Sequence, residues 1–313
     1  MKLSLVVPCY NEAENVKAFC EAVMAVFDGC GYAYEIVFID DGSKDATLHN
    51  LKKLHAARQC PVKVVSFSRN FGKEAGLYAG LEHSSGDYIC LIDADLQQDP
   101  AIARQMVDIL DEKPDCDVVA AYQDRRSEGM ILSFFKRSFY SIINLLSDVK
   151  FRSDASDFRC FRKSVAQSML AMTEAHRFSK GIFSWVGYET CYIPYVAKPR
   201  VAGKTKWSFR KLMNYALEGI IGFSTKPLRI ATYIGTITAI AAIIYLIAVV
   251  CEKLIWGISI PGYATAIVLI LLLGGIQLFC IGIIGEYVGK IFEQGKNRPI
   301  YIAKEVLTYD ETK

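Results

Sequence analysis

The sequence predicts an α/β fold, with a parallel sheet covered by helices on both faces, followed by a hairpin of two transmembrane helices. Over roughly the first 120 residues, short β-rich runs alternate with helix-like segments, which is the pattern of a parallel sheet. Later in the chain, two stretches at about 230–251 and 264–285 contain no charged residue. Each stretch has about 22 residues, enough to cross roughly 30 Å of hydrocarbon at about 1.5 Å per residue.

The strands of the sheet are expected where Val, Ile, Leu and Phe cluster. These runs lie at 3–7, 35–39, 62–67, 88–92 and 117–121. Between them, apolar residues recur with helical spacing, for example at 13–27 and 101–110. Strand and helix therefore alternate along this part of the chain, as expected of a sheet with helices on both faces.

Two further segments, at about 130–147 and 206–227, mix apolar with basic residues. Each predicts an amphipathic helix that lies in the membrane interface, and the alternative is an ordinary helix packed on the sheet. We expect the chain to divide into a cytoplasmic domain that includes the first of these helices, a juxtamembrane helix, a membrane hairpin and a cytoplasmic tail. Their expected bounds are 1–205, 206–227, 228–289 and 290–313.

Basic side chains flank both outer ends of the two apolar stretches, whereas the turn between the stretches carries one lysine. By the positive-inside rule, the N-terminal domain and the tail lie on the cytoplasmic side of the membrane. Two buried core helices of a soluble domain are the alternative, but such helices rarely run this long without a charge. The flanking cations are Lys204, Lys206, Arg210, Lys211, Lys226, Arg229, Lys290, Lys296, Arg298 and Lys304.

Cysteine spacing and net charge argue against several other classes of protein. The ten cysteines are scattered without a CxxC pair, so neither a zinc site nor a disulfide framework is expected. The formal net charge of +3 is too small to indicate binding of nucleic acid, and the basic residues gather near the membrane flanks instead.

Polar residues follow three of the predicted strands at the point where each strand ends. They occupy 8–12, 40–43 and 93–97, after the first, second and fourth strands. Any one of these segments could be an ordinary turn, because Asp, Asn and Gly are common in turns. Ligands bind at the carboxyl ends of the strands in open α/β sheets, so three such segments at one edge predict a binding site.

Asp93 and Asp95 are separated by one residue, so in an extended segment both carboxylates point the same way. Such a pair repels unless a cation lies between the two groups, and a Mg²⁺ or Mn²⁺ ion that also binds a diphosphate meets this requirement. The metal would stabilise negative charge on a departing diphosphate. The chain has no GxGxxG and no GxxxxGKS/T motif, so we expect the metal and cationic side chains to neutralise the phosphates.

Several short runs form a specific combination along nearly the whole chain. They are VVPCYNE, IDDGSKD, DADLQ, SDFRCFRK and RVAGKTKWSFRKL, followed by the two apolar stretches. In this combination the chain resembles the family 2 glycosyltransferases that act on polyprenyl phosphates. These are the dolichol phosphate mannose synthases and, closer in architecture, the bacterial bactoprenol glucosyltransferases. The resemblance implies a nucleotide-binding domain of the GT-A type.

The resemblance also implies a role for each matching residue. Asp93 and Asp95 would bind the metal, and Asp157 in the DFR run matches a carboxylate near the reacting centre. Arg200 and Lys206 would reach the phosphates, which makes them catalytic candidates together with Asp157 and Asp95. The residues that would hold the nucleotide are Pro8, Tyr10, Glu12, Ile39, Asp41, Asp93, Ala94 and Gln97.

One position departs from the pattern of the family. Gln123 stands after the fifth strand where the family often has Arg, and Arg125 or Arg126 is the candidate to replace it. The lipid phosphate adds negative charge next to the diphosphate, so further cations must separate the two groups. For any single cation, a solvated or headgroup-binding basic face is the alternative role. The candidates for the lipid phosphate are Arg159, Arg162 and Lys204.

Other side chains carry two interpretations each. Lys73 either approaches a phosphate from the loop after the third strand or is a surface lysine at the start of a helix. His176 fits a structural or surface role better than a contact with the acceptor, because no second ligand lies nearby in the sequence. Trp185 and Trp207 are candidates for membrane-interface anchors, but core packing fits Trp185 better.

The expected chemistry follows from the charge of the acceptor. A lipid monophosphate has a second pKa of about 6, so at neutral pH it is mostly a nucleophilic dianion that needs little help from a general base. We therefore expect Asp157 to orient the acceptor or the sugar, or to bind the cations that hold the phosphate, instead of removing a proton. The resemblance implies a single displacement that inverts the anomeric carbon.

The two-span architecture resembles that of the bactoprenol glucosyltransferases, and this resemblance implies transfer of glucose from UDP-glucose to undecaprenyl phosphate at the inner membrane. GDP-mannose, UDP-N-acetylglucosamine, UDP-galactose and a modified arabinose donor stay open, because sugar specificity depends on a few hydrogen bonds. A processive polysaccharide synthase would resemble its relatives in a QxxRW motif and further spans, which this chain lacks. A non-catalytic membrane scaffold would not need the carboxylates that this chain retains. The family resemblance also suggests a homo-oligomer, as a tetramer.

Overall fold

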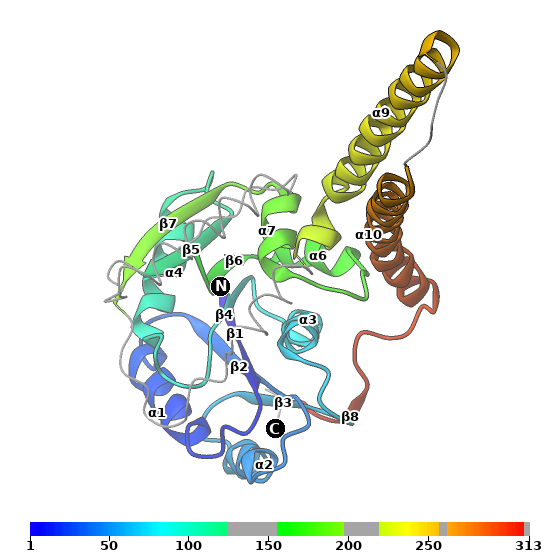
Figure 1. Cartoon of the computed structure of the whole chain (residues 1–313). Coiled ribbons are helices and arrows are strands. Elements are labelled where there is room, and N and C mark those ends of the chain that lie inside the picture. Colours follow the sequence, from blue (N-terminus) through cyan, green and yellow to red (C-terminus); the bar gives the residue numbers. More distant parts are fainter. Residues whose placement is uncertain (124–154, 197–218, 257–261, 310–313) are drawn as a thin grey trace.

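The domain is built on one mixed sheet, of which this computed structural model shows eight strands within the residues it describes, 1–123, 155–196, 219–256 and 262–309 (Figure 1). The strand order is β7-β5-β6-β4-β1-β2-β3-β8. The strands are β1 (Lys2–Cys9), β2 (Ala33–Asp40), β3 (Val62–Phe67), β4 (Tyr88–Leu91), β5 (Val118–Gln123), β6 (Ala155–Arg162), β7 (Thr190–Tyr195) and β8 (Ala303–Leu307).

Four adjacent strands, β1, β2, β3 and β4, pair in parallel, and β5 also pairs in parallel with β7. Most residues of these four strands are buried on both faces, as in β1, where 3–7 is buried without interruption. The predicted strand at 62–67 has the same bounds in the structure, and the other predicted strands differ by one or two residues at their ends.

The sheet is not parallel throughout, which corrects the prediction. β6 lies between β4 and β5 and runs antiparallel to both, and β8 runs antiparallel to β3 at the edge. These two strands were not expected from the sequence, and neither was β7: charged residues interrupt the apolar residues of β6 and β8, and β7 contains a proline and few buried residues. A strand of this kind is recognisable only from its pairing with a distant partner.

Helices cover both faces of the sheet, as the sequence predicts. One core lies under α1, α2 and α4, and the opposite face packs under α3, α6 and α7, nearer the hairpin (Figure 1). Gly80 brings α3 close to β1, since a Cβ at this position would lie 2.1 Å from Val6 Cγ1. The helices are α1 (Val16–Phe27), α2 (Thr47–Ala57), α3 (Lys73–His83), α4 (Pro100–Glu112), α6 (Lys163–Ala171) and α7 (Ser179–Val186).

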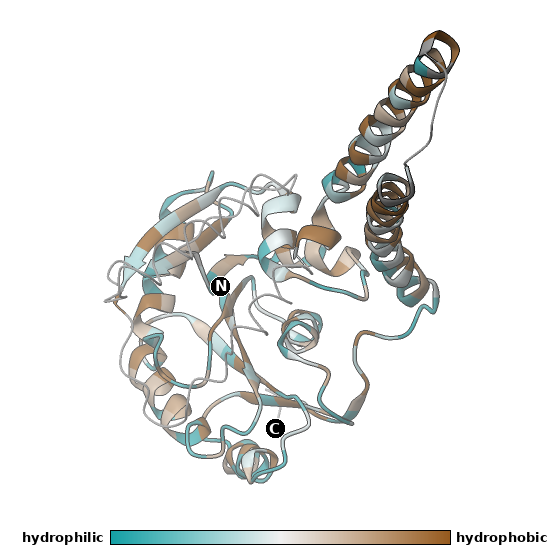
Figure 2. Cartoon of the chain, viewed as in Figure 1, coloured by the Kyte–Doolittle hydropathy of each residue, from teal (hydrophilic) through white to brown (hydrophobic). Residues whose placement is uncertain are grey.

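Two long helices, α9 (Lys226–Trp256) and α10 (Tyr263–Gly295), project from the domain as a hairpin (Figure 1). Hydrophobic residues predominate along both helices (Figure 2), which are unburied and are long and apolar enough to cross a membrane. The helices pack together near the domain, where Tyr287 Oη donates to the Ser224 carbonyl at 2.7 Å. The structure therefore gives the two expected apolar stretches the form of a candidate transmembrane hairpin.

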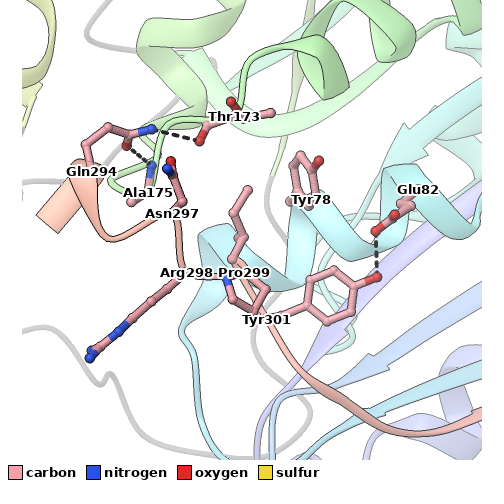
Figure 3. Close-up of a pocket in the computed structure, with 10 residues that line it drawn as sticks. Tyr78, Glu82, Thr173, Ala175, Gln294, Asn297, Arg298, Pro299 and Tyr301 are labelled. Carbon is pink, nitrogen blue, oxygen red and sulfur yellow. Dashed lines mark hydrogen bonds between the residues drawn. The ribbon is translucent and has the colours of Figure 1, made fainter.

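The chain after α10 returns to the catalytic domain instead of forming a separate tail. We call residues 296–307 the C-terminal strap, because it runs along α3 and ends as β8 beside β3. The ring of Tyr301 stacks on Phe67 with centroids 4.8 Å apart, and its hydroxyl donates to Glu82 at 2.6 Å. A cavity of about 480 Å³ lies between the strap, α3 and the connection between α6 and α7 (Figure 3).

Candidate active site

The loops that follow β1, β2, β3 and β4 meet at one edge of the sheet, because these strands are parallel. Gly42, after β2, has a φ of 64°, and a Cβ there would lie 2.5 Å from the carbonyl carbon of Arg69, after β3. The loop after β1 is tied in by Asn11, whose backbone N donates to Ser43 Oγ (3.0 Å) and whose Oδ1 accepts from the Lys44 backbone N (2.9 Å). The predicted polar segments therefore form one surface.

Asp41 fixes the start of α3 above this edge. Its carboxylate accepts hydrogen bonds from the backbone N–H groups of Phe71 (2.6 Å) and Gly72 (2.9 Å). Burial raises the pKa of Asp41, and these two hydrogen bonds oppose the rise only in part. Lys73, the first residue of α3, is thereby placed at the sheet edge. A contact between Asp41 and a nucleoside stays a prediction.

Lys73 joins two carboxylates that come from different elements. Its Nζ lies 2.8 Å from Asp93 Oδ1 and 3.3 Å from Asp157 Oδ2. The antiparallel register pairs Leu91 with Arg159, so Asp93 and Asp157 face each other just beyond the last paired residues of β4 and β6. Two carboxylates this close require a cation between them, and the ammonium group supplies it. Of the two interpretations of Lys73, the structure favours the one that places it at the site.

This group of three charges remains within reach of a ligand. The side chains of Lys73, Asp93 and Asp157 are 42%, 37% and 30% exposed. Together with Pro8 they line a shallow recess at the edge of the sheet. The three charged side chains are therefore partly open to solvent at this edge.

Asp157 is held in its charged form. Withdrawal from water would raise the pKa of its carboxyl, but Lys73, Lys180 and Arg159 outweigh this effect and lower the pKa to about 2. An efficient general base has a pKa near the operating pH, so a carboxylate this acidic is a poor proton acceptor. The electrostatics thus favour the expected role of Asp157 as an orienting group that binds cations.

Glu74, next to Lys73, links the start of α3 to the start of α7. Its Oε2 accepts from the Ser179 backbone N at 2.9 Å and also from the Ser179 hydroxyl. Burial, with Asp157 adding to it, raises the pKa of Glu74 to about 7, although the bonds from Ser179 and the charge of Lys73 act in the opposite direction. The carboxyl group of Glu74 therefore titrates near neutral pH beside the site.

Asp93 and Asp95, the two carboxylates of the DADLQ run, are suited to bind a divalent metal ion together with the phosphates of a substrate. Asp95 Oδ1 accepts from the Gln97 backbone N at 3.1 Å, and Leu96 between them takes the left-handed conformation with φ of 57°. Among the described residues, no group of three or more His, Cys, Asp or Glu side chains gathers to hold a metal. Mg²⁺ and Mn²⁺ can bind at a site with only two protein carboxylates, because oxygen atoms of substrate phosphates and of water complete the coordination of the ion. Asp93 and Asp95 are the residues that would hold it.

The residues predicted to bind the nucleotide differ in how much of their side chains is exposed. Ile39 and Ala94 lie at the correct edge, but their side chains are buried in the two cores, so only their backbone atoms are left for a ligand. Glu12 lies in the loop after β1, where its Oε2 accepts from Asn15 Nδ2 at 2.7 Å. Tyr10 and Gln97 are half-buried in the loops of the same edge. Their contacts with a nucleotide stay predictions.

The structure separates two arginines that the sequence placed at the lipid phosphate. Arg159 lies beside Asp157, is 8% exposed and covers the Phe183 ring at 4.4 Å. Arg162 pairs with Tyr88 at the far end of β6, and its guanidinium donates to carbonyls there, including that of Leu110 at 2.7 Å. This geometry contradicts the predicted phosphate role of Arg162, because β6 carries it to the opposite edge of the sheet.

Several predicted residues lie outside the described residues. They are Arg125, Arg126, Arg200, Lys204, Lys206 and Trp207, together with the expected amphipathic helix at 130–147 and most of the one at 206–227. Trp185 is described and is 62% exposed, so the expected core packing of this residue is wrong. His176 lies on the surface and contacts Glu293 of α10, in keeping with the structural role expected for it.

Sequence reasoning missed Glu74 and Lys180. Both follow the first residue of a helix, where charged side chains are common on any protein surface. The run GKE after the third strand was the available signal for Glu74, because it directly follows Lys73. Lys180 had no signal, since only the packing of α7 against α3 brings it to Asp157.

A site of this kind, on an α/β domain with an apolar hairpin, is typical of a membrane-associated transferase that uses an activated, diphosphate-bearing donor. The chain belongs to glycosyl transferase family 2, whose model matches residues 4–170. A second model, described as the GtrB C-terminal hairpin, matches residues 226–291. The domain is thus a glycosyltransferase domain of the GT-A type, and the two apolar helices correspond to the hairpin of that model.

Similar proteins match along almost the whole chain. A prophage bactoprenol glucosyl transferase homolog of Escherichia coli (strain K12) is 42% identical over 98% of this chain and 99% of its own length. The bactoprenol glucosyl transferase of Shigella phage SfII is 42% identical over 97% of this chain and 98% of its own length. An uncharacterized glycosyltransferase of Synechocystis is 37% identical over 98% and 96% of the two chains.

Proposed function

We propose that the protein transfers glucose from UDP-glucose to the phosphate of a polyisoprenyl phosphate, undecaprenyl phosphate, at the cytoplasmic face of the cell membrane. The observation that carries the proposal is the contact of Lys73 with both Asp93 and Asp157 in a chain whose site domain continues into the apolar hairpin. The lipid acceptor and the glucose are supported by the bactoprenol glucosyl transferases that match along the chain. The choice of uridine nucleotide rests on the resemblance alone.

Each side chain has a defined task in this reaction. Asp93 and Asp95 would hold a Mg²⁺ or Mn²⁺ ion, which stabilises charge on the departing diphosphate. Asp157 stays ionised and fixes the cations around the reacting groups, because its pKa is too low for it to take a proton. The phosphate of the acceptor is itself the nucleophile, and a single displacement inverts the anomeric carbon. The proposed catalytic set is completed by Arg200 and Lys206.

The proposed location follows from charge and architecture. Basic residues on both outer flanks of the hairpin favour a cytoplasmic position for the domain and for the C-terminus. The chain would then be a two-span protein of the inner membrane. A homo-oligomer, as a tetramer, stays a prediction.

The test is transfer of labelled sugar to undecaprenyl phosphate by the purified full-length protein in detergent. We expect UDP-glucose to give the highest kcat/KM in a panel with UDP-N-acetylglucosamine, UDP-galactose and GDP-mannose. Asp95→Asn should lower kcat/KM by about a hundredfold or more, because the metal loses one of its two carboxylates. Asp115→Asn, on an exposed surface loop, is the matched control and should keep wild-type activity.

Two results would overturn the proposal. Sugar transfer that is insensitive to metal chelation and unchanged in Asp95→Asn would contradict the assignment of a metal site to Asp93 and Asp95. A clear preference for another nucleotide sugar would keep the class of reaction and replace the donor.

A further inference from the structure

The acceptor phosphate needs a cation that is not already committed to a protein carboxylate. Lys73 is shared between Asp93 and Asp157. Arg159 is largely buried against Phe183, with its Nε donating to the Ser156 carbonyl at 3.3 Å. Neither side chain is free to move toward an incoming lipid without breaking these contacts.

Lys180 is placed differently. It is half-buried, and within the described part of the chain its ammonium group has no hydrogen bond and no ion pair. The residue before it, Ser179, donates twice to Glu74, which directly follows Lys73 at the start of α3. This link sets the first turn of α7 beside the group formed by Lys73, Asp93 and Asp157.

The same turn of α7 packs against the segment that enters the membrane. The ring centroids of Phe178 and Phe223 lie 6.2 Å apart, and a Cβ added to Gly181 would lie 2.5 Å from Cε2 of Phe223. Phe223 lies shortly before Lys226, the first residue of α9. Lys180 therefore lies on a turn that contacts both the segment before α9 and Glu74, and its charge acts on Asp157.

We propose that Lys180 binds the phosphate of the lipid acceptor and that Glu74 is the positioning residue that holds α7 in place for this contact. The inference rests on the proposed function for the identity of the acceptor. The ammonium group of Lys180 has three hydrogen-bond donors, which can form charge-assisted hydrogen bonds with the dianionic phosphomonoester of the lipid. The attraction of Lys180 for Asp157 is consistent with this position, since it helps to keep that carboxylate charged.

The experiment measures binding instead of turnover. Full-length protein in detergent is titrated with undecaprenyl phosphate and, separately, with undecaprenol, which has the same chain without the phosphate. We expect Lys180→Gln to raise the Kd for undecaprenyl phosphate about tenfold or more, because one charge-assisted contact is lost. Lys180→Arg should stay close to wild type, since it keeps the charge. Lys163→Gln is the matched control, because Lys163 opens α6 and is exposed.

Each outcome decides the question. A selective loss in Lys180→Gln, with unchanged binding of undecaprenol and of UDP, supports the assignment even if the sugar donor proves to be another one. Wild-type affinity for undecaprenyl phosphate in Lys180→Gln would overturn it and leave the proposed transfer reaction intact. Equal affinity of the wild-type protein for both lipids would overturn it as well, because the phosphate would then contribute nothing.

Discussion

The acidic and basic side chains of the site nearly balance before any substrate binds. Asp93, Asp95 and Asp157 carry the negative charges, and three cations near them, Lys73, Arg159 and Lys180, carry the positive ones. Donor and acceptor phosphates then add several negative charges to the same edge of the sheet. Such a site requires further cations at the moment of reaction, which a divalent metal and the basic residues near the hairpin are suited to supply.

Glu74 predicts a pH dependence of stability. Its pKa is about 7 in the folded protein, whereas a glutamate of an unfolded chain titrates at about 4.3. Between these values the folded state binds more protons than the unfolded state, so the free energy of unfolding falls as the pH rises through this window. Glu74→Gln removes this titration. We therefore expect its melting temperature to change less than that of the wild type between about pH 5 and about pH 8.

Scanning fluorimetry of the detergent-solubilised protein measures this difference. Glu112→Gln, on the exposed end of α4, is the control and should follow the wild-type curve. Parallel curves for wild type and Glu74→Gln would contradict the assignment of the titrating group to Glu74.

The strands β1 to β5, whose residues are mostly apolar and buried, could be predicted from the sequence, whereas β6, β7 and β8 could not. β3 was expected with its observed bounds, because Val62–Phe67 is buried on both faces of a parallel sheet. β6 contains the run SDFRCFR, in which the charged residues Asp157 and Arg159 interrupt the apolar pattern typical of a strand. Its strand conformation depends on pairing with β4 and β5. The sequence motifs identified Asp93, Asp95 and Asp157 as site residues. They could not predict that Lys73 contacts Asp93 and Asp157, because this contact depends on the pairing of β6 with β4.

The C-terminal strap is expected to depend on Tyr301, whose ring stacks on Phe67 and whose hydroxyl donates to Glu82. Tyr301→Ala removes both contacts and should loosen the pairing of β8 with β3. We expect the amides of β8 to exchange hydrogen about tenfold faster or more, which corresponds to roughly 1.4 kcal/mol of lost local stability.

Hydrogen exchange followed by mass spectrometry tests this effect of Tyr301 on the strap. Tyr301→Phe is the matched control, because it keeps the stacked ring and loses only the hydroxyl; its exchange should lie between those of wild type and Tyr301→Ala. Unchanged exchange of β8 in Tyr301→Ala would show that strand pairing alone holds the strap.

Both ends of the hairpin are attached to the same domain, α9 through the packing of Phe223 on α7 and α10 through the strap. With both helices spanning a membrane, as proposed, we expect the C-terminus on the same side as the sheet and the turn between α9 and α10 on the other side. In a Cys251→Ser background, we expect a membrane-impermeant maleimide added to intact cells to label Gly262→Cys and not Thr308→Cys. Labelling of Thr308→Cys in place of Gly262→Cys would reverse the proposed orientation, and labelling of both would contradict a hairpin whose two ends lie on one side.

The position of β8 also dictates the order in which the protein can be assembled. Both apolar helices precede β8 in the chain, so during synthesis the outer edge of β3 stays uncovered until the ribosome has delivered the hairpin to the bilayer. An uncovered strand edge invites pairing with other chains. Completion of the sheet therefore waits for synthesis of both apolar helices, and a chain truncated before β8 would keep this strand edge exposed.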